Sequence, residues 1–125
     1  MKKLLLILLL VLSLPVVSQT YNLNANYLVV SDGIDTKEGK TDVDMVLNVS
    51  SSTLTIYSKD IQLIDYIVIK SYEEKGYTVF EANATDTKYR RIGLKLSFAN
   101  NANAVIVTIK YSDVRYSYIC KIMSS

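Results

Sequence analysis

Hydrophobic and polar positions alternate along most of the chain after its first 20 residues, and the alternation is clearest from residue 89 to 123. Ile92, Leu94 and Leu96 alternate there with polar or small residues, as side chains do on the two faces of a half-buried strand. Two further alternating stretches follow, separated by an Asn-rich turn and by Ser112-Asp113. The pattern predicts three consecutive antiparallel strands over 89–98, 105–111 and 114–122.

The same alternation predicts five earlier strands, over 21–30, 41–50, 53–57, 61–72 and 77–82, with a loop over 31–40. Eight short strands joined by tight turns indicate an all-β fold. Short turns favour an up-and-down meander, because Greek-key connections are longer. We therefore expect an eight-stranded antiparallel meander that forms a closed or nearly closed barrel, since closure removes exposed strand edges. Closure would pair the last strand with the one beginning near Tyr21, and a two-layer β-sandwich is the alternative.

The predicted strand 61–72 is apolar on both of its faces. Ile61, Leu63, Ile67 and Ile69 share one face with Asp65, and Ile64, Tyr66 and Val68 lie on the other. A strand of this kind is either covered on both faces or leaves an exposed apolar patch that marks a contact surface. Tyrosine also provides a large contact area with little loss of entropy. The candidate partner-contact residues are Ile64, Tyr66, Val68, Tyr116 and Tyr118.

The first 18 residues have the three parts of a secretory signal peptide. Lys2 and Lys3 precede an unbroken apolar run, and small residues precede Gln19. This order predicts a signal helix that is cleaved near Ser18/Gln19, and the apolar run is shorter than the roughly 20 residues of a spanning helix. We expect residues 1–18 to be the signal peptide and residues 19–125 to form a single all-β domain. That domain would be periplasmic or secreted, with no stable membrane anchor.

Charge is distributed unevenly along the chain. The formal net charge of +2 includes Lys2 and Lys3, so the chain that follows the leader is neutral. Between residue 19 and Asp86 there are five Lys against eleven Asp or Glu, and from there on seven Lys or Arg against one Asp. Pairing of opposite charges across neighbouring strands explains this better than a polarised surface. A small and compensated basic part gives no support for nucleic-acid binding.

Two carboxylates fall within apolar phases of predicted strands, Asp65 and Glu81. A carboxylate on an apolar face can act as a general acid with a raised pKa, or it can pair with a cation inside or across the sheet. We favour the second reading. The candidate buried charge partners are Asp65, Glu81, Arg90 and Arg91, with Lys95 as a further cation.

Several kinds of chemistry are absent from the sequence. There is no His, which excludes Ser-His-Asp and Cys-His activation and zinc sites that contain His. Cys120, the single cysteine, lies in an apolar strand phase and is expected to be a small core residue. The acidic residues lack the spacing of a calcium loop. We expect a non-enzymatic protein with no cofactor, no metal site and no catalytic residues.

The run Tyr57-Ser58-Lys59-Asp60-Ile61-Gln62, the following Asp65-Tyr66 and the hairpin Tyr111-Ser112-Asp113-Val114 resemble segments of small secreted Bacteroidota proteins of unknown function. The short apolar leader ending in Ser-Gln is similar to theirs. In size and strand count the chain also resembles lipocalin-like barrels, including staphostatin-type inhibitors of secreted cysteine proteases. The Gly-x-Trp signature of lipocalins is absent, because the chain has no Trp.

Two functions follow from these observations. The first is a secreted or periplasmic binding module that contacts a protein partner, of which a protease-inhibitor-like protein is one form. The alternative is a carrier of a small apolar ligand inside a lipocalin-like barrel. A barrel of eight strands has an interior that its own side chains can fill. A cavity would therefore favour the carrier, and a filled core with an apolar outer patch would favour the binding module.

Overall fold

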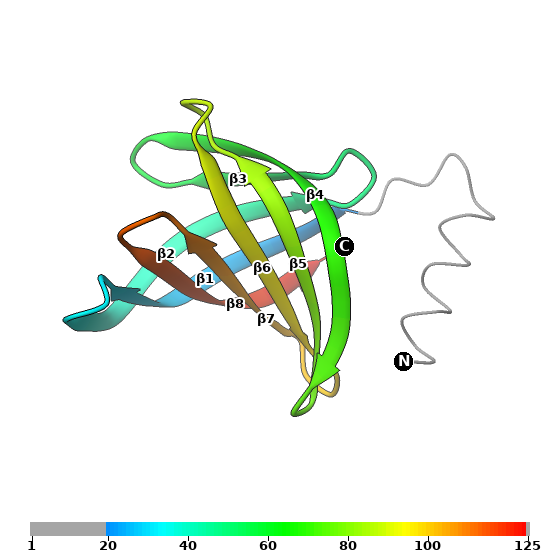
Figure 1. The fold of residues 1–125 in the computed structure, drawn as a ribbon. Coiled ribbons are helices and arrows are strands. Elements are labelled where there is room, and N and C mark those ends of the chain that lie inside the picture. Colours follow the sequence, from blue (N-terminus) through cyan, green and yellow to red (C-terminus); the bar gives the residue numbers. More distant parts are fainter. Residues whose placement is uncertain (1–19, 125) are drawn as a thin grey trace.

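Eight antiparallel strands follow one another around a closed barrel in the computed structural model, which describes residues 20–124 (Figure 1). Each strand pairs with its neighbours in sequence, and the last pairs with the first. This confirms the predicted closed meander, while the predicted signal helix lies outside the described residues. The strands are β1 (Thr20–Ser31), β2 (Thr36–Asn48), β3 (Thr53–Tyr57), β4 (Ile61–Glu74), β5 (Tyr77–Thr85), β6 (Arg91–Ala99), β7 (Ala104–Lys110) and β8 (Arg115–Ser124).

The barrel closes through the pairing of β1 with β8. Ala25 lies opposite Cys120, and Leu28 lies opposite Tyr118. The register of β1 shifts between Ala25 and Tyr27 against both β2 and β8. A bulge of this kind bends a strand and increases its twist, and so helps the sheet to curve back on itself.

The prediction of a loop over residues 31–40 is wrong for residues 36–40, which form a strand. Thr36 to Lys40 belong to β2 and pair with Ser31 to Tyr27, so the turn is confined to residues 32–35. The Asp32 carboxylate fixes this turn by accepting backbone N–H bonds from Ile34 (2.9 Å) and Asp35 (2.7 Å). Residues 36–40 are all exposed, so no apolar alternation signals the strand, and backbone pairing alone forms it.

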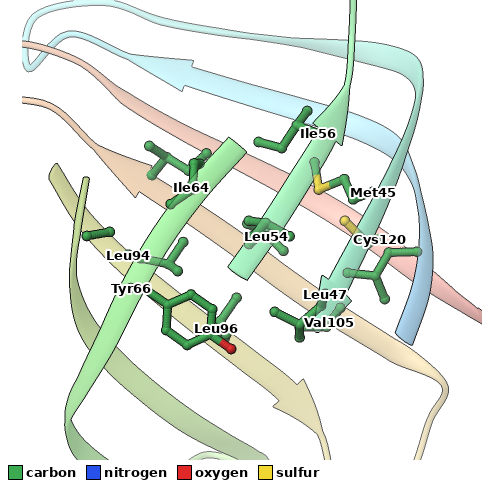
Figure 2. Packing of buried hydrophobic residues seen from close by; sticks show 14 of the residues in the cluster. Met45, Leu47, Leu54, Ile56, Ile64, Tyr66, Leu94, Leu96, Val105 and Cys120 are labelled. Atoms are coloured by element: carbon green, nitrogen blue, oxygen red, sulfur yellow. The ribbon is translucent and has the colours of Figure 1, made fainter. Parts of the chain in front are cut away.

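Apolar side chains from all eight strands fill the interior of the barrel (Figure 2). Seven of them are 0% exposed, namely Ala25, Leu47, Leu54, Ile56, Ile64, Val105 and Val107. A void wide enough for one water molecule would leave part of its lining accessible. The centre of the barrel is therefore packed with side chains and leaves no room beside these residues for a ligand.

Cys120 belongs to this core, as its place in an apolar phase predicted. The residue is 2% exposed, and burial raises the pKa of its thiol to about 12. The thiolate is the reactive form of cysteine, so at neutral pH this side chain is a protonated and inert packing residue.

Candidate functional site

Five of the eleven large hydrophobic side chains that are exposed among the described residues lie on β4, and only one of them was predicted from the sequence as a contact. Ile64 and Tyr66 point into the barrel and are 0% and 6% exposed, so their assignment as partner contacts is wrong (Figure 2). The reason is that both phases of β4 are apolar, and alternation alone does not tell which one faces inward. The register decides it, because Ile64 lies opposite the buried Leu54 of β3.

The exposed phase of β4 is the one that contains Asp65. Its aliphatic side chains, together with Val68, form what we call the β4 strip: Ile61 (63% exposed), Leu63 (47%), Ile67 (72%), Val68 (45%) and Ile69 (62%). Val68 is the only predicted contact residue of this strand that is exposed. Exposed aliphatic side chains occurring singly need no explanation, whereas five along one strand indicate a contact surface.

One side of β4 also lacks a neighbouring strand over part of its length. β3 begins at Thr53, which lies opposite Asp65, and the Tyr66 N–H donates to the carbonyl of the preceding Ser52 (3.0 Å). Beyond Tyr66, β4 pairs with β5 alone within the described residues. The long curved strand is visible along one side of the barrel in Figure 1. Residues 67–72 therefore form a sheet edge beside the most exposed part of the β4 strip, with a register shift between Val68 and Lys70.

The predicted tyrosine contacts lie elsewhere on the barrel. Tyr116 and Tyr118 are partly buried residues of β8, which is four strands away from β4 in either direction. The Tyr116 ring packs edge-on against Tyr111, with ring centroids 6.0 Å apart, and burial raises the pKa of the Tyr118 hydroxyl. The structure does not bring these two residues together with β4, and Tyr118 packs against the core.

The predicted buried charge partners are mostly on the surface. Asp65, Arg90 and Arg91 are exposed, and Glu81 is partly buried. Glu81 lies opposite Lys95 in the β5–β6 register, but no ion pair joins these two side chains within the described residues. Its carboxylate also accepts a hydrogen bond of 2.5 Å from the hydroxyl of Tyr72, and this bond raises the pKa of Tyr72 to about 12.

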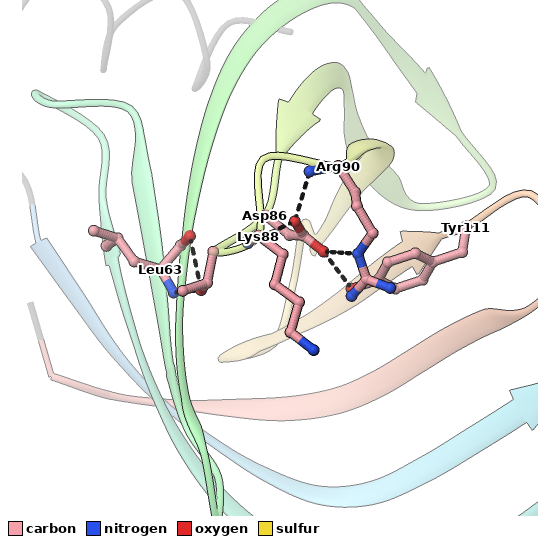
Figure 3. Close-up of polar contacts among 6 residues, drawn as sticks. Leu63, Asp86, Lys88, Arg90 and Tyr111 are labelled. Carbon is pink, nitrogen blue, oxygen red and sulfur yellow. Dashed lines mark hydrogen bonds and ion pairs between the residues drawn. The ribbon is translucent and has the colours of Figure 1, made fainter.

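The buried carboxylate of this protein is Asp86, which lies between the predicted strands 77–82 and 89–98 and was not predicted as a site residue. Its side chain is 3% exposed and pairs with the Nε of Arg90 at 2.8 Å (Figure 3). It also accepts backbone N–H bonds from Lys88 (3.0 Å) and Arg90 (2.8 Å), and a long bond from the Tyr111 hydroxyl (3.4 Å). The Arg90 guanidinium lies 4.9 Å from the centre of the Tyr111 ring.

Two opposing effects act on the pKa of Asp86. Burial raises the pKa. The hydrogen bonds and charge of Arg90, together with the N–H of Lys88, lower it by more than burial raises it, so the pKa lies below its ordinary value. The carboxylate is thus held ionised by a closed set of donors from the β5–β6 turn. This arrangement is a structural anchor, since its oxygens are already occupied. In the sequence, this turn is indicated only by an Asp that precedes the residues donating their backbone N–H groups, Lys88 and Arg90, by two and four positions.

The same turn is tied to β4 by Thr87. Its Oγ1 accepts the backbone N–H of Leu63 at 2.8 Å, which continues the β4–β5 ladder after the last backbone pair (Figure 3). Thr87 therefore ties the first half of β4 to the β5–β6 turn. Beyond Tyr66, whose N–H bonds to the Ser52 carbonyl, the other edge of β4 has no backbone partner within the described residues.

Within residues 20–124, the Cys, Asp and Glu side chains nowhere gather into the group of three that a metal ion requires. No helix in this range has the length and apolar character needed to cross a membrane.

The fold and surface define a class of protein: a closed, side-chain-filled antiparallel β-barrel with an exposed aliphatic strip along one strand. Comparison of the chain with models of known protein families, with curated proteins and with solved structures finds no match. The proposals below therefore rest on the geometry of the barrel.

Proposed function

We propose that the protein is a non-enzymatic, exported binding module that takes up an extended segment of a partner protein along β4. The observation that carries this proposal is the coincidence of two features at residues 67–72. A sheet edge lies open on the side away from β5, and Ile67, Val68 and Ile69 expose 72%, 45% and 62% of their surface beside it. In strand addition, backbone hydrogen bonds at such an edge supply affinity, and alternate side chains supply specificity.

A partner with aliphatic residues fits this surface better than a second copy of the chain. A two-fold axis centred on residues 67–72 would place Lys70 of each copy against Ile69 of the other. That contact buries a cation beside an aliphatic side chain without an opposite charge, which is unfavourable. A different protein that presents aliphatic side chains to Ile67 and Ile69 and a polar one to Lys70 avoids this cost.

The filled interior does not favour the carrier. Side chains at the centre of the barrel are fully enclosed, so an apolar ligand would have to displace them. A protease-inhibitor-like protein remains one form of the proposed module, in which the bound segment belongs to a secreted cysteine protease. If a panel of such proteases stays fully active in the presence of excess protein, the inhibitor function is excluded. The proposal of a binding module is unaffected by that result.

We expect a photo-crosslinking residue at position 67 to form one defined adduct with a protein in the fluid into which the chain is exported. The matched control carries the same residue at position 119, an isoleucine of β8 that is 38% exposed on the far side of the barrel. The adduct should form from position 67 only. Equal adducts from both positions, no adduct, or an adduct with the mass of two copies of this chain would each contradict the proposal.

The substitution Ile69→Pro tests whether the backbone edge is used. Position 69 is skipped in the β4–β5 register, and proline is tolerated at bulges and edges, so the barrel should still fold. We expect the adduct from position 67 to disappear, whereas Ile69→Ser should weaken binding by about tenfold or more through loss of buried aliphatic area. If Ile69→Pro unfolds the barrel, the test rests on Ile69→Ser alone. Partner binding that is unchanged in Ile69→Ser would exclude the β4 strip as the binding surface.

A further inference from the structure

A second feature adjoins the β4 strip, on the outer face of the strands β5 to β8, and Ile69 of β4 also lines it. It is a shallow depression of about 420 Å³ whose floor is Gly93. Ile92 and Leu94, on either side of Gly93, point into the core, so residue 93 faces outward. The missing side chain leaves a gap between Asn83 of β5 and Lys110 of β7, which are its neighbours in register.

The cations around this gap are not all compensated. Lys110 lies directly opposite Arg115 in the β7–β8 register, and like charges directly opposite one another destabilise a sheet. No ion pair joins either residue to a carboxylate within the range that the structure describes. Asp113, in the turn between these strands, does not line the depression. Charge pairing across strands therefore does not account for Lys110 and Arg115.

Two hydroxyl groups lie next to the cations. Thr108 and Ser117 are opposite each other in register, one outward position further along β7 and β8, and their Oγ atoms are 3.4 Å apart. Both line the depression together with Lys95, Lys110 and Arg115. Glu81 also lines it, but its carboxylate already accepts the Tyr72 hydroxyl and faces Lys95.

We infer that this depression binds an oxyanion, such as a phosphate or sulfate group of a ligand. The Arg115 guanidinium and the Lys110 ammonium supply charge-assisted hydrogen bonds, and the Thr108 and Ser117 hydroxyls donate to the remaining oxygens. The open floor at Gly93 gives the anion space to approach both cations at once. Occupation relieves the repulsion between Lys110 and Arg115, which the empty surface retains. Ile69 of the β4 strip also lines the depression, so Gly93→Leu and Lys110→Thr, which lie outside the strip, distinguish the anion site from the partner surface.

The test is a titration of the mature protein with sodium sulfate and sodium phosphate, compared with sodium chloride at equal ionic strength. Backbone amide resonances are followed by NMR. We expect saturable shifts at Gly93, Thr108, Lys110 and Ser117 that fit one dissociation constant and that chloride does not reproduce. Linear shifts that chloride reproduces, or shifts of equal size around Lys121, would show an ordinary solvated basic surface and overturn the inference.

Gly93→Leu is the decisive variant, because it fills the floor without removing a charge. The backbone there is not in the left-handed region, and a Cβ atom would lie 3.7 Å from the Cβ of Lys110, an ordinary contact. We expect sulfate to bind at least about tenfold more weakly, the equivalent of one charge-assisted hydrogen bond. Gly93→Ala should give a smaller loss. Wild-type affinity in a folded Gly93→Leu variant would contradict the site.

Charge variants give the matched comparison. Lys110→Thr should weaken sulfate binding by about tenfold, while Lys121→Thr, an exposed lysine of β8 away from the depression, should leave it unchanged. Lys110→Thr should also not reduce the thermal midpoint, because it removes a like-charge pair. Equal losses from both substitutions would mean that net charge, and not this site, attracts the anion.

A vesicle assay then identifies the source of the oxyanion. If the group belongs to a lipid headgroup, the protein should sediment with vesicles of phosphatidylcholine containing phosphatidic acid, and Gly93→Leu should abolish sedimentation. If sulfate binds in solution and the vesicles do not retain the protein, the ligand is a soluble phosphorylated or sulfated molecule. Either result supports an oxyanion site at Gly93. If Gly93→Leu still sediments with the vesicles, the lipid headgroup does not bind at this site.

Discussion

Ile64→Ala should lower the free energy of unfolding by about 2–5 kcal/mol, because it removes a fully buried side chain from the centre of the barrel. Its neighbours Leu54, Ile56 and Leu47 are 0% exposed and are held by strand pairing, so the cavity will close only in part. A domain of this size is stable by only about 5–15 kcal/mol. The loss should therefore appear as a large fall in the urea midpoint at an unchanged slope.

Ile67→Ala is the matched control, with the same substitution on the same strand and the opposite face. Ile67 is 72% exposed, so we expect a change of less than about 1 kcal/mol, within the range of strand propensity. The pair tests the orientation of β4 directly, because a slip of one residue exchanges the two faces. Equal losses, or a larger loss for Ile67→Ala, would show that β4 is turned the other way.

This orientation is where reasoning from the sequence first failed. The alternation of apolar and polar residues predicted eight strands, their order and the pairing of the first with the last, because most of those strands contain a stretch with one clearly apolar phase. In β4 both phases are aliphatic, so the pattern carries no information on which one is buried. Only the register with β3, set by pairs such as Leu54 with Ile64, decides it. The exposed strip was thus predicted on the right strand and the wrong face.

Other features were missed because they depend on contacts between distant residues. The strand at 36–40 has no apolar phase and exists through pairing with 27–31. The depression at Gly93 is visible only when β5 to β8 are placed side by side, since Lys110 and Arg115 flank a turn in the sequence and give no sign of an open floor. Arg90 was expected to continue the strand that follows it, whereas its side chain turns back to Asp86.

Asp86→Asn should lower the free energy of unfolding at pH 7 by about 1.5–3 kcal/mol, the range for hydrogen bonds to a charged group. The substitution removes the charge that faces Arg90 and turns one acceptor oxygen into a donor, while keeping the size of the side chain. The Arg90 side chain is 57% exposed and can turn to water, which keeps the loss below that of a fully buried ion pair. Asp113→Asn, in the exposed turn between β7 and β8, is the control and should change stability by less than about 0.5 kcal/mol.

The contribution of Asp86 should also depend on pH in a defined direction. Its pKa is lower in the folded chain than the ordinary value of 3.8, so near and below that pH the unfolded chain binds a proton that the folded chain does not. The stabilisation is therefore complete above about pH 5 and is lost as the pH falls through the folded pKa. In urea titrations, the difference between the wild type and Asp86→Asn should be constant from pH 7 to 5 and should shrink at pH 3. A difference that stays the same or grows at pH 3 would mean that Asp86 is not held as a carboxylate.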